Sequence, residues 1–196
     1  MLETLKQADT NLFLFLNGLH SPFFDVLMFQ VSLPLFWIPF YLLLIVLLFR
    51  KYRWQAMWIL LFVAVLITAT DQGAVHLFKN VFLRLRPSQE PALQGTIHLV
   101  NGYKGGIYGF ISNHAANTFA LAVFLAIVVN DLFRGFVPLM IFWAFLLSYS
   151  RIYLGVHYPG DILAGIIFGT VLALIFAWIF KKFVPLKKKY NQNPLL

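Results

Sequence analysis

Long apolar runs alternate with short polar segments along the chain, and this pattern predicts an all-α membrane protein. A helix needs about 20 apolar residues to cross a bilayer. Five segments approach that length, namely residues 23–49, 54–83, 113–129, 136–150 and 159–183. Pro34 and Pro39 should kink the first of them. The second exceeds the thickness of the hydrocarbon core, so its end should protrude into water. We therefore expect a polytopic transmembrane helix bundle with about five spans.

The segment before the first span has a different pattern. Residues 1–20 carry charges at Glu3 and Lys6 and a short apolar run that is too brief to cross a membrane. We expect an amphipathic helix at the membrane interface, with its apolar face toward lipid. The side chains assigned to that face are Leu5, Leu12, Phe13 and Leu16. Residues 21–184 then form the transmembrane domain, and residues 185–196 form a basic tail.

Residues 87–111 interrupt the apolar pattern with glycines, prolines and polar side chains. Irregular backbone cannot face lipid, because its N–H and C=O groups would lack partners there. This segment is therefore expected to be an extramembrane loop that is able to cover a site.

The composition supports a membrane protein and excludes several other classes. Apolar residues make up 61% of the chain, charged residues only 11%, and the mean hydropathy is +0.80; soluble domains are ~25% charged. The net charge of +8 does not indicate nucleic-acid binding, because the cations lie mostly in short loops and the tail rather than on one soluble face. The absence of cysteine excludes disulfides, zinc–thiolate sites and iron–sulfur clusters.

The distribution of cations predicts an orientation. With five spans, nine of the fifteen Lys and Arg residues fall on one side of the membrane. They are Arg50, Lys51, Arg53, Arg134, Lys181, Lys182, Lys187, Lys188 and Lys189. By the positive-inside rule that side, including the C-terminus, is cytoplasmic.

Strongly polar residues gather at the ends of four spans. They are Lys79 and Arg86 after the second, Ser112, Asn113 and His114 at the start of the third, Arg151 after the fourth, and His157 and Asp161 around the start of the fifth. In a chain that crosses back and forth, these ends share one face, here the outer one. Arg86 and Arg151 can offer bidentate forks to an anion, and Lys79 adds a compact charge. Ser112 and Asn113 lie where a helix N-terminus favours anions. The set predicts a phosphate-binding site.

Two histidines complete this set. Asp161, four residues after His157, can accept the imidazole N–H and raise the basicity of the ring, so we assign His157 as nucleophile. His114 has no carboxylate at such a spacing and is assigned as general acid. Taken alone, His157 and Asp161 could be a helix-capping pair, and Arg86 could be an interfacial anchor. Their combination with the other cations favours a site that cleaves a phosphate ester.

These residues resemble the motifs of the type 2 phosphatidic acid phosphatase superfamily, which are K-x6-R-P, P-S-G-H and S-R-x5-H-x3-D. The first and third motifs match at every defining position, from Lys79 to Pro87 and from Ser150 to Asp161. The second departs at two positions, with Ile111 in place of Pro and Asn113 in place of Gly. The motifs and the helices between them cover about residues 54–182.

The resemblance implies a reaction through a phosphohistidine on His157, without a metal or other cofactor. His114 would be the acid, and Lys79, Arg86, Ser112, Arg151 and the amide at Asn113 would hold the phosphoryl group. Bacterial members act on undecaprenyl diphosphate, phosphatidylglycerol phosphate, phosphatidic acid or lipid A, at the periplasmic side of the cytoplasmic (inner) membrane. The expected partners are thus a lipid phosphate and the bilayer. The sequence does not indicate the oligomeric state or which of these headgroups is the substrate.

Further polar residues lie outside the motifs. Arg84, His98 and Lys104 could contact a substrate headgroup, whereas Asp71 and His76 within the second span are interpreted as structural. Two other functions remain open: a phosphotransferase that passes the phosphoryl group to a second acceptor, and a transporter or lipid-binding protein without catalysis. Comparing free with transferred phosphate tests the first, and replacement of the nucleophile tests the second.

Overall fold

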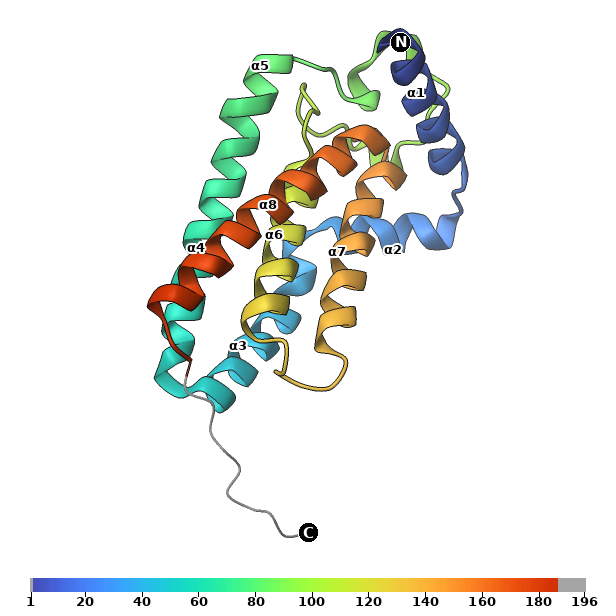
Figure 1. The fold of residues 1–196 in the computed structure, drawn as a ribbon. Helices are drawn as coiled ribbons and strands as arrows, with labels where there is room; N and C mark the ends of the chain where they lie inside the picture. The colour runs from blue at the N-terminus through green and yellow to red at the C-terminus, as the bar shows by residue number, and fades with distance from the viewer. Residues whose placement is uncertain (1, 187–196) are drawn as a thin grey trace.

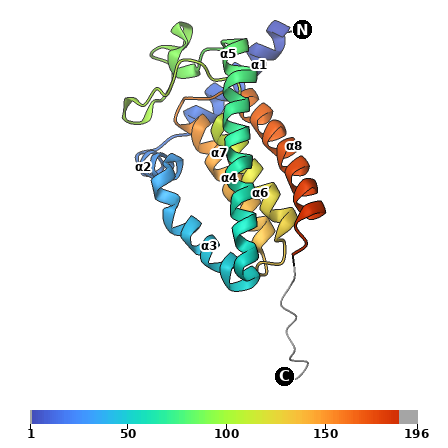
Figure 2. The same cartoon turned by 90° about the vertical axis from the view of Figure 1, so that its left-hand side faces the viewer.

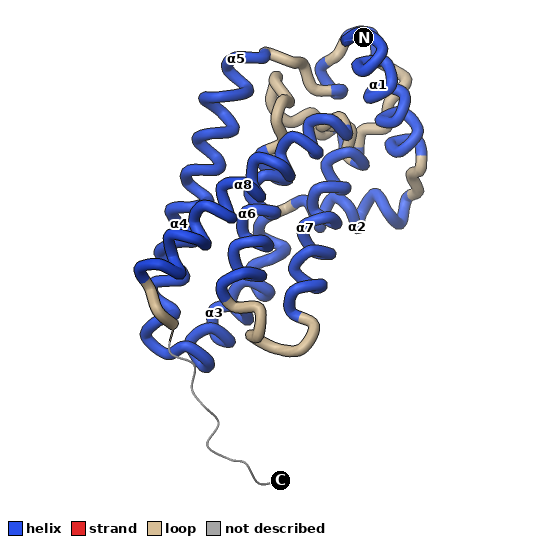
Figure 3. The backbone as a smooth tube through the Cα atoms, in the orientation of Figure 1, coloured by secondary structure: helices blue, strands red, loops and turns tan. Residues whose placement is uncertain are grey.

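The computed structural model describes residues 2–186, most of which are helical (Figure 1). The α-helices are α1 (Leu2–Gly18), α2 (Pro22–Ser32), α3 (Ile38–Tyr52), α4 (Ala56–Gly73), α5 (Asn80–Phe82), α6 (Asn113–Val128), α7 (Phe136–Tyr153) and α8 (Pro159–Phe183). A π-helix, Ala74–Lys79, joins α4 to α5, and short 3-10 helices span Pro34–Trp37, Arg53–Gln55, Pro87–Gln89, Pro91–Leu93 and Val100–Gly102. The described part of the chain contains helix and loop but no strand (Figure 3). The protein is an all-α bundle, as the sequence predicts.

Three helical stretches among the described residues are long and apolar enough to cross a membrane. They are Pro34–Phe82, Phe136–Tyr153 and Pro159–Phe183, and the pair α1–α2, bent by 115°, gives a fourth if it counts as one span. The first stretch turns sharply at Arg53, whose φ of 55° is left-handed, so α3 and α4 leave this turn as separate arms (Figure 2). Leaving aside the α1–α2 pair, the helices α3, α4, α7 and α8 make five passages through the bundle together with α6, an apolar helix of 16 residues.

The first expected span, residues 23–49, is not one kinked helix. Helix α2 ends at Ser32, Leu33 is extended, and α3 begins only at Ile38. Pro34 causes this break, because it has no N–H to continue the helix and disfavours helical geometry in the residue before it. Helix α2 packs against α7, and the start of α3 also reaches α7, where Phe40 and Tyr41 contact Trp143.

Helix α1 has an exposed apolar side and a side buried against the bundle, and only the exposed side was predicted from the sequence. Leu5 and Leu12 are exposed, as expected for a lipid-facing side. Phe13 is instead 0% exposed and lies edge-on to the ring of Tyr158, 5.4 Å between centroids. Leu16 is partly buried and packs against the same cluster. The assignment of Phe13 and Leu16 to lipid was therefore wrong, because this side of α1 packs on the bundle.

Small residues let α8 approach α6 closely. Gly165, Gly169, Ala173 and Ala177 recur every fourth residue on one buried side of α8. Such a stripe allows two membrane helices to pack backbone against backbone. A Cβ atom added at Gly169 would fall 2.1 Å from the carbonyl oxygen of Ala116 on α6. The most extensive helix contact in the described structure, α6 with α8, thus depends on glycine at this position.

Replacement of Gly169 by Ala should destabilise the bundle, because the added methyl group must push α6 and α8 apart. Overpacking of this kind costs about 1–3 kcal/mol. Thermal unfolding of the purified protein in detergent should therefore occur at a lower temperature. The control is Ile167→Ala on the exposed side of α8, which should unfold close to the wild-type temperature. An unchanged transition for Gly169→Ala would contradict this packing argument.

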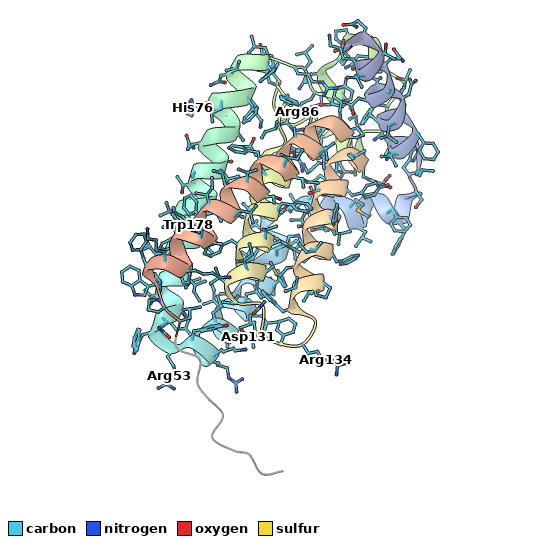
Figure 4. All side chains as sticks on the ribbon, viewed as in Figure 1. Arg53, His76, Arg86, Asp131, Arg134 and Trp178 are labelled. Atoms are coloured by element: carbon cyan, nitrogen blue, oxygen red, sulfur yellow. The ribbon has the colours of Figure 1, made fainter. Side chains whose placement is uncertain are left out.

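The two ends of the bundle differ in charge. Arg53, in the α3–α4 turn, and Arg134, in the α6–α7 turn, lie at the end where α8 finishes, whereas Arg86 lies at the opposite end (Figure 4). Lys181 and Lys182 in the last turn of α8 add to the first end. The predicted separation of loop cations from the polar motif residues is thus present among the described residues. The remaining tail cations, Lys187–Lys189, lie outside them.

Candidate active site

The loop that follows Arg86 folds back onto the residues just before it and covers the site. We call residues 87–111 the cap loop. Arg84 and Arg86 pair with its last residues: the N–H of Arg86 donates to the carbonyl of Ile107 (3.0 Å), and the N–H of Gly109 donates to the carbonyl of Arg84 (2.8 Å). The side chain of Arg86 also donates from Nε to the carbonyl of Tyr108 (3.2 Å). Arg86 is therefore buried and fixed under the loop.

Two glycines lie where the cap loop passes over Arg86, and a larger residue at either would crowd the polar side chains. A Cβ atom at Gly105, whose φ is +66°, would lie 2.7 Å from Nη1 of Arg86. One at Gly109 would lie 3.2 Å from Cγ of Arg86 and 3.0 Å from Oδ2 of Asp161. The two glycines let the loop backbone approach the polar side chains directly.

The spacing between Arg151 and His157 is set by a tight turn. The N–H of His157 donates to the carbonyl of Arg151 (3.2 Å), as does the N–H of Val156 (3.1 Å). Gly155 makes this return possible with a φ of +74°. The five residues between Arg151 and His157 thus close a loop that brings the two side chains to one place.

Asp161 is the centre of the contacts at the start of α8. It is completely buried, and its Oδ2 accepts a hydrogen bond from the N–H of Tyr158 (3.0 Å) and lies 3.4 Å from Nδ1 of His157. Its carbonyl accepts from the N–H of Ser112 (3.0 Å), which ties the starts of α6 and α8 together. Asp161 can therefore hold the proton of His157 on Nδ1, leaving Nε2 as the atom with a free lone pair.

Arg151 is buried although it carries a permanent charge. Its side chain is 3% exposed, Nη2 donates to the hydroxyl of Tyr103 (3.2 Å), and its Nε has no hydrogen-bond partner in the described part of the chain. A buried charged donor without a partner is costly, and such groups in native proteins call for an explanation. An anion bound beside Arg151 would supply the missing acceptor.

Lys79 and His114, the other predicted site residues, lie close enough to Arg86, Arg151 and His157 to interact with them electrostatically. The charges of Arg151, Arg86 and Lys79 act on both imidazoles, and His157 also interacts with His114. Lys79 is partly buried at the end of the π-helix and is influenced by Asp161 as well. Residues from the α4–α5 segment, α6, α7 and α8 therefore meet at one end of the bundle.

The His157 imidazole is held in its neutral form. Burial lowers its pKa well below the ordinary value, and the charges of Arg86, Arg151 and Lys79 lower it further. A hydrogen bond with the backbone of Gly109 opposes this shift only in part. A neutral imidazole is the form that can attack phosphorus, so the surroundings of His157 suit a nucleophile.

Ser112 and Asn113 differ in what they offer to an anion. Ser112 is the N-cap of α6, and its hydroxyl oxygen accepts from the N–H of Ala115 (3.4 Å). The Asn113 side chain turns to Asp71, donating from Nδ2 to Oδ1 at 2.6 Å, and Asn117 donates to the same oxygen at 3.4 Å. The side-chain contact to phosphate expected of Asn113 is thus redirected, which leaves its backbone N–H. Asp71 is bound by side-chain amides, in keeping with the structural role expected of it.

The three expected headgroup residues have different surroundings. Arg84 is bound to carboxylates, with 2.8 Å to Oδ1 of Asp161. His98 is held on the α2 side, where its Nε2 lies 2.9 Å from Oδ1 of Asp25 and its ring stacks on His20. Lys104 is exposed on the cap loop. Of these residues, only Arg84 contacts a member of the motifs directly.

Two further residues contribute to the site without belonging to any motif, namely Asp9 and Tyr103. Asp9 on α1 accepts hydrogen bonds from Arg84 and from the N–H of Gly160. It lies four residues before Phe13 and eight before the buried Asn17, a helical spacing that could have indicated a second packed face. Tyr103 lies in the cap loop, and no periodic pattern marks its contact with Arg151.

The sequence of this chain is similar to a known family and to named relatives. A family model described as the PAP2 superfamily matches residues 56–185. A lipid A 4'-phosphatase of Bacteroides thetaiotaomicron is 39% identical over 184 residues, which are 93% of this chain and 81% of that protein. A lipid A 4'-phosphatase of Porphyromonas gingivalis is 34% identical over 174 residues, 87% of this chain and 72% of that protein.

Two solved structures share the fold. The transmembrane PAP2 type phosphatidylglycerolphosphate phosphatase from Bacillus subtilis superposes with a TM-score of 0.69 at 20% identity, over 94% of this chain and 90% of that one. Aquifex aeolicus LpxE superposes with a TM-score of 0.62 at 21% identity, over 85% of this chain and 93% of that one. The architecture of the bundle is therefore that of known membrane phosphatases.

Proposed function

The chain belongs to the PAP2 superfamily, and from this premise we propose that it is a lipid A phosphatase that removes the 4'-phosphate. Two relatives named lipid A 4'-phosphatase, each more than 30% identical over most of both chains, support this substrate. The observation that carries the proposal is the meeting of two imidazoles and three cations at one end of the bundle, where the buried Nε of Arg151 has no acceptor among the described residues.

The reaction that these residues support proceeds in two steps. Nε2 of His157 attacks phosphorus while Asp161 holds the proton on Nδ1, and the bond to the ester oxygen breaks as His114 gives that oxygen a proton. Then His114, now neutral, takes a proton from water, and the resulting hydroxide attacks the phosphohistidine. The P–N bond breaks, orthophosphate leaves, and His157 is restored. Arg86, Arg151 and Lys79 balance the charge of the phosphoryl oxygens throughout.

We propose that the site faces the periplasm and that the C-terminus is cytoplasmic. The support is the charge difference between the ends of the bundle, since the loop cations around Arg53 and Arg134 lie at the end far from Arg86 (Figure 4). In this orientation the acyl chains of the substrate stay in the bilayer, and only the phosphorylated sugar must reach the cap loop.

Phosphate release from a lipid panel tests the substrate and the chemistry together. The purified protein should release orthophosphate from lipid A faster than from undecaprenyl diphosphate, phosphatidylglycerol phosphate or phosphatidic acid. Addition of EDTA should leave the rate unchanged, because protein cations carry the phosphoryl charge in the proposed reaction. A preference for another lipid would reject the substrate assignment, and loss of activity with EDTA would reject the metal-free mechanism. Phosphate transferred to a second lipid instead of water would identify a phosphotransferase.

A further inference from the structure

We propose that Asp9 is a positioning residue: through Arg84 it sets how strongly Asp161 supports the nucleophile His157. The proposal rests on the proposed function and adds α1 to its machinery. A series of contacts from Asp9 to His157 supports the proposal. Nη2 of Arg84 donates to Oδ2 of Asp9 at 2.7 Å, and Nη1 of the same guanidinium donates to Oδ1 of Asp161 at 2.8 Å. Asp161 in turn meets His157 with its other oxygen.

The contacts around Arg84 fix this series in place. Oδ1 of Asp9 accepts from the N–H of Gly160 at 2.7 Å, so α1 is attached to the first turn of α8. A Cβ atom at residue 160 would come within 2.8 Å of the Asp9 carboxylate, so glycine makes room for it. The guanidinium of Arg84 lies over the ring of Tyr158, 4.0 Å from its centroid, and Phe13 of α1 packs on the same ring. Both ends of the Arg84 fork are therefore held.

The physical effect of Asp9 is to share the charge of Arg84. Burial opposes the charged form of Arg84, but Asp161 and Asp9 outweigh it and raise the pKa of the guanidinium, which stays protonated. With two carboxylates on one fork, Asp161 feels only part of the positive charge. If Asp9 lost its charge, the whole guanidinium would act on Asp161. Asp161 would then stabilise positive charge on His157 less well, and the imidazole would be a weaker nucleophile.

Other charged groups face His157 from every element around it. They are Asp161 on α8, His114 on α6, Arg151 on α7, Lys79 on the π-helix and Arg86 before the cap loop. Asp9 touches none of these groups except through Arg84 and the backbone of α8. A change at Asp9 therefore alters the field at His157 mainly along one route.

The test is Asp9→Asn, with Glu3→Gln as the matched control. The amide oxygen of the introduced side chain can still accept from the N–H of Gly160, so the attachment of α1 persists while the charge is lost. Glu3 is exposed on the same helix and pairs only with Lys6 among the described residues. Asp9→Asn should lower kcat about tenfold, the lower end of the loss that follows removal of an outer hydrogen-bond partner of a metal-binding histidine. KM should stay within about twofold, because the phosphate-binding cations are unchanged.

The pH profile separates positioning from general damage. The acid limb of kcat/KM reports the protonation of the free nucleophile. Asp9→Asn should move this limb to lower pH, because His157 then binds its proton less tightly. Arg84→Gln removes the cation and should move the limb to higher pH. In the Arg84→Gln background, Asp9→Asn should change kcat less than about twofold, because the route is already cut.

The outcomes distinguish this proposal from the proposed function. If the wild type releases no phosphate from any lipid of the panel, the function is rejected, and the role of Asp9 with it. If the wild type is active and Asp9→Asn equals Glu3→Gln in kcat and acid limb, the role of Asp9 alone is rejected. Limbs that move in the same direction in Asp9→Asn and Arg84→Gln would also overturn it. The proposal is supported if the acid limb moves in opposite directions in Asp9→Asn and Arg84→Gln. In that case Asp9→Asn should also unfold at the same temperature as the wild type.

Discussion

Replacement of His157 by Ala should reduce phosphate release at least about 10⁴-fold, the loss that follows removal of a catalytic group acting in a unit. His157 is the buried imidazole that meets Asp161, and no other described histidine has this partner at the phosphate site. Wild-type protein quenched in acid-free conditions after brief exposure to substrate labelled in its phosphate should carry the label covalently. His157→Ala should carry none.

The matched control is His76→Ala. His76 is exposed on the π-helix and points away from the bundle (Figure 4), so its loss should leave the rate near that of the wild type. His114→Ala should differ from both variants, since it keeps the nucleophile but lacks the proton donor. It should therefore label slowly and lose the label slowly. Residual activity of His157→Ala close to the wild type would mean that the phosphohistidine mechanism is wrong.

Replacement of Arg151 by Gln should lower kcat about 10³-fold, the effect expected when a guanidinium that stabilises a transferring phosphoryl group is lost. The reason is structural: the Arg151 side chain is buried and its Nε has no acceptor among the described residues, so a phosphoryl oxygen bound there would supply one. Inhibition by inorganic vanadate should weaken in the same variant, because the oxyanion uses the same fork.

Arg151→Lys tests geometry apart from charge. Lysine keeps the positive charge but offers no planar fork, so this variant should still lose about 10²-fold. Arg134→Gln is the control, because Arg134 is an exposed arginine at the opposite end of the bundle (Figure 4). Full activity in Arg151→Lys would show that the charge alone suffices. Full activity in Arg151→Gln would remove Arg151 from the proposed site.

Much of this arrangement follows from the sequence, since apolar runs predict helices and alternating helices bring their ends together. The resemblance that the motifs indicated is confirmed by the match of the family model over residues 56–185. The meeting of Lys79, Arg86, Arg151 and His157 needed only the order of the spans and the motif spacings. In particular, the turn that joins Arg151 to His157 is local, so its spacing is visible in the sequence.

The remaining contacts could not be predicted because they join distant residues without a periodic signal. Asp9 meets Gly160 across 151 positions of the chain, and a lone carboxylate on an amphipathic helix equally fits a solvated face. Asn113 departs from the family motif, and its bond to Asp71 depends on the register of α4 against α6. Pro34 and Pro39 were expected only to kink one helix over residues 23–49, whereas the chain breaks at Leu33 and α2 packs against α7.

The single carbonyl of Arg151 that receives the N–H groups of Val156 and His157 has a genetic consequence. Because one oxygen atom anchors both the proposed phosphate-binding residue and the proposed nucleophile, an insertion or deletion between them would displace both at once. Substitutions can accumulate at the lipid-facing positions nearby, but a change in the length of this segment should abolish activity.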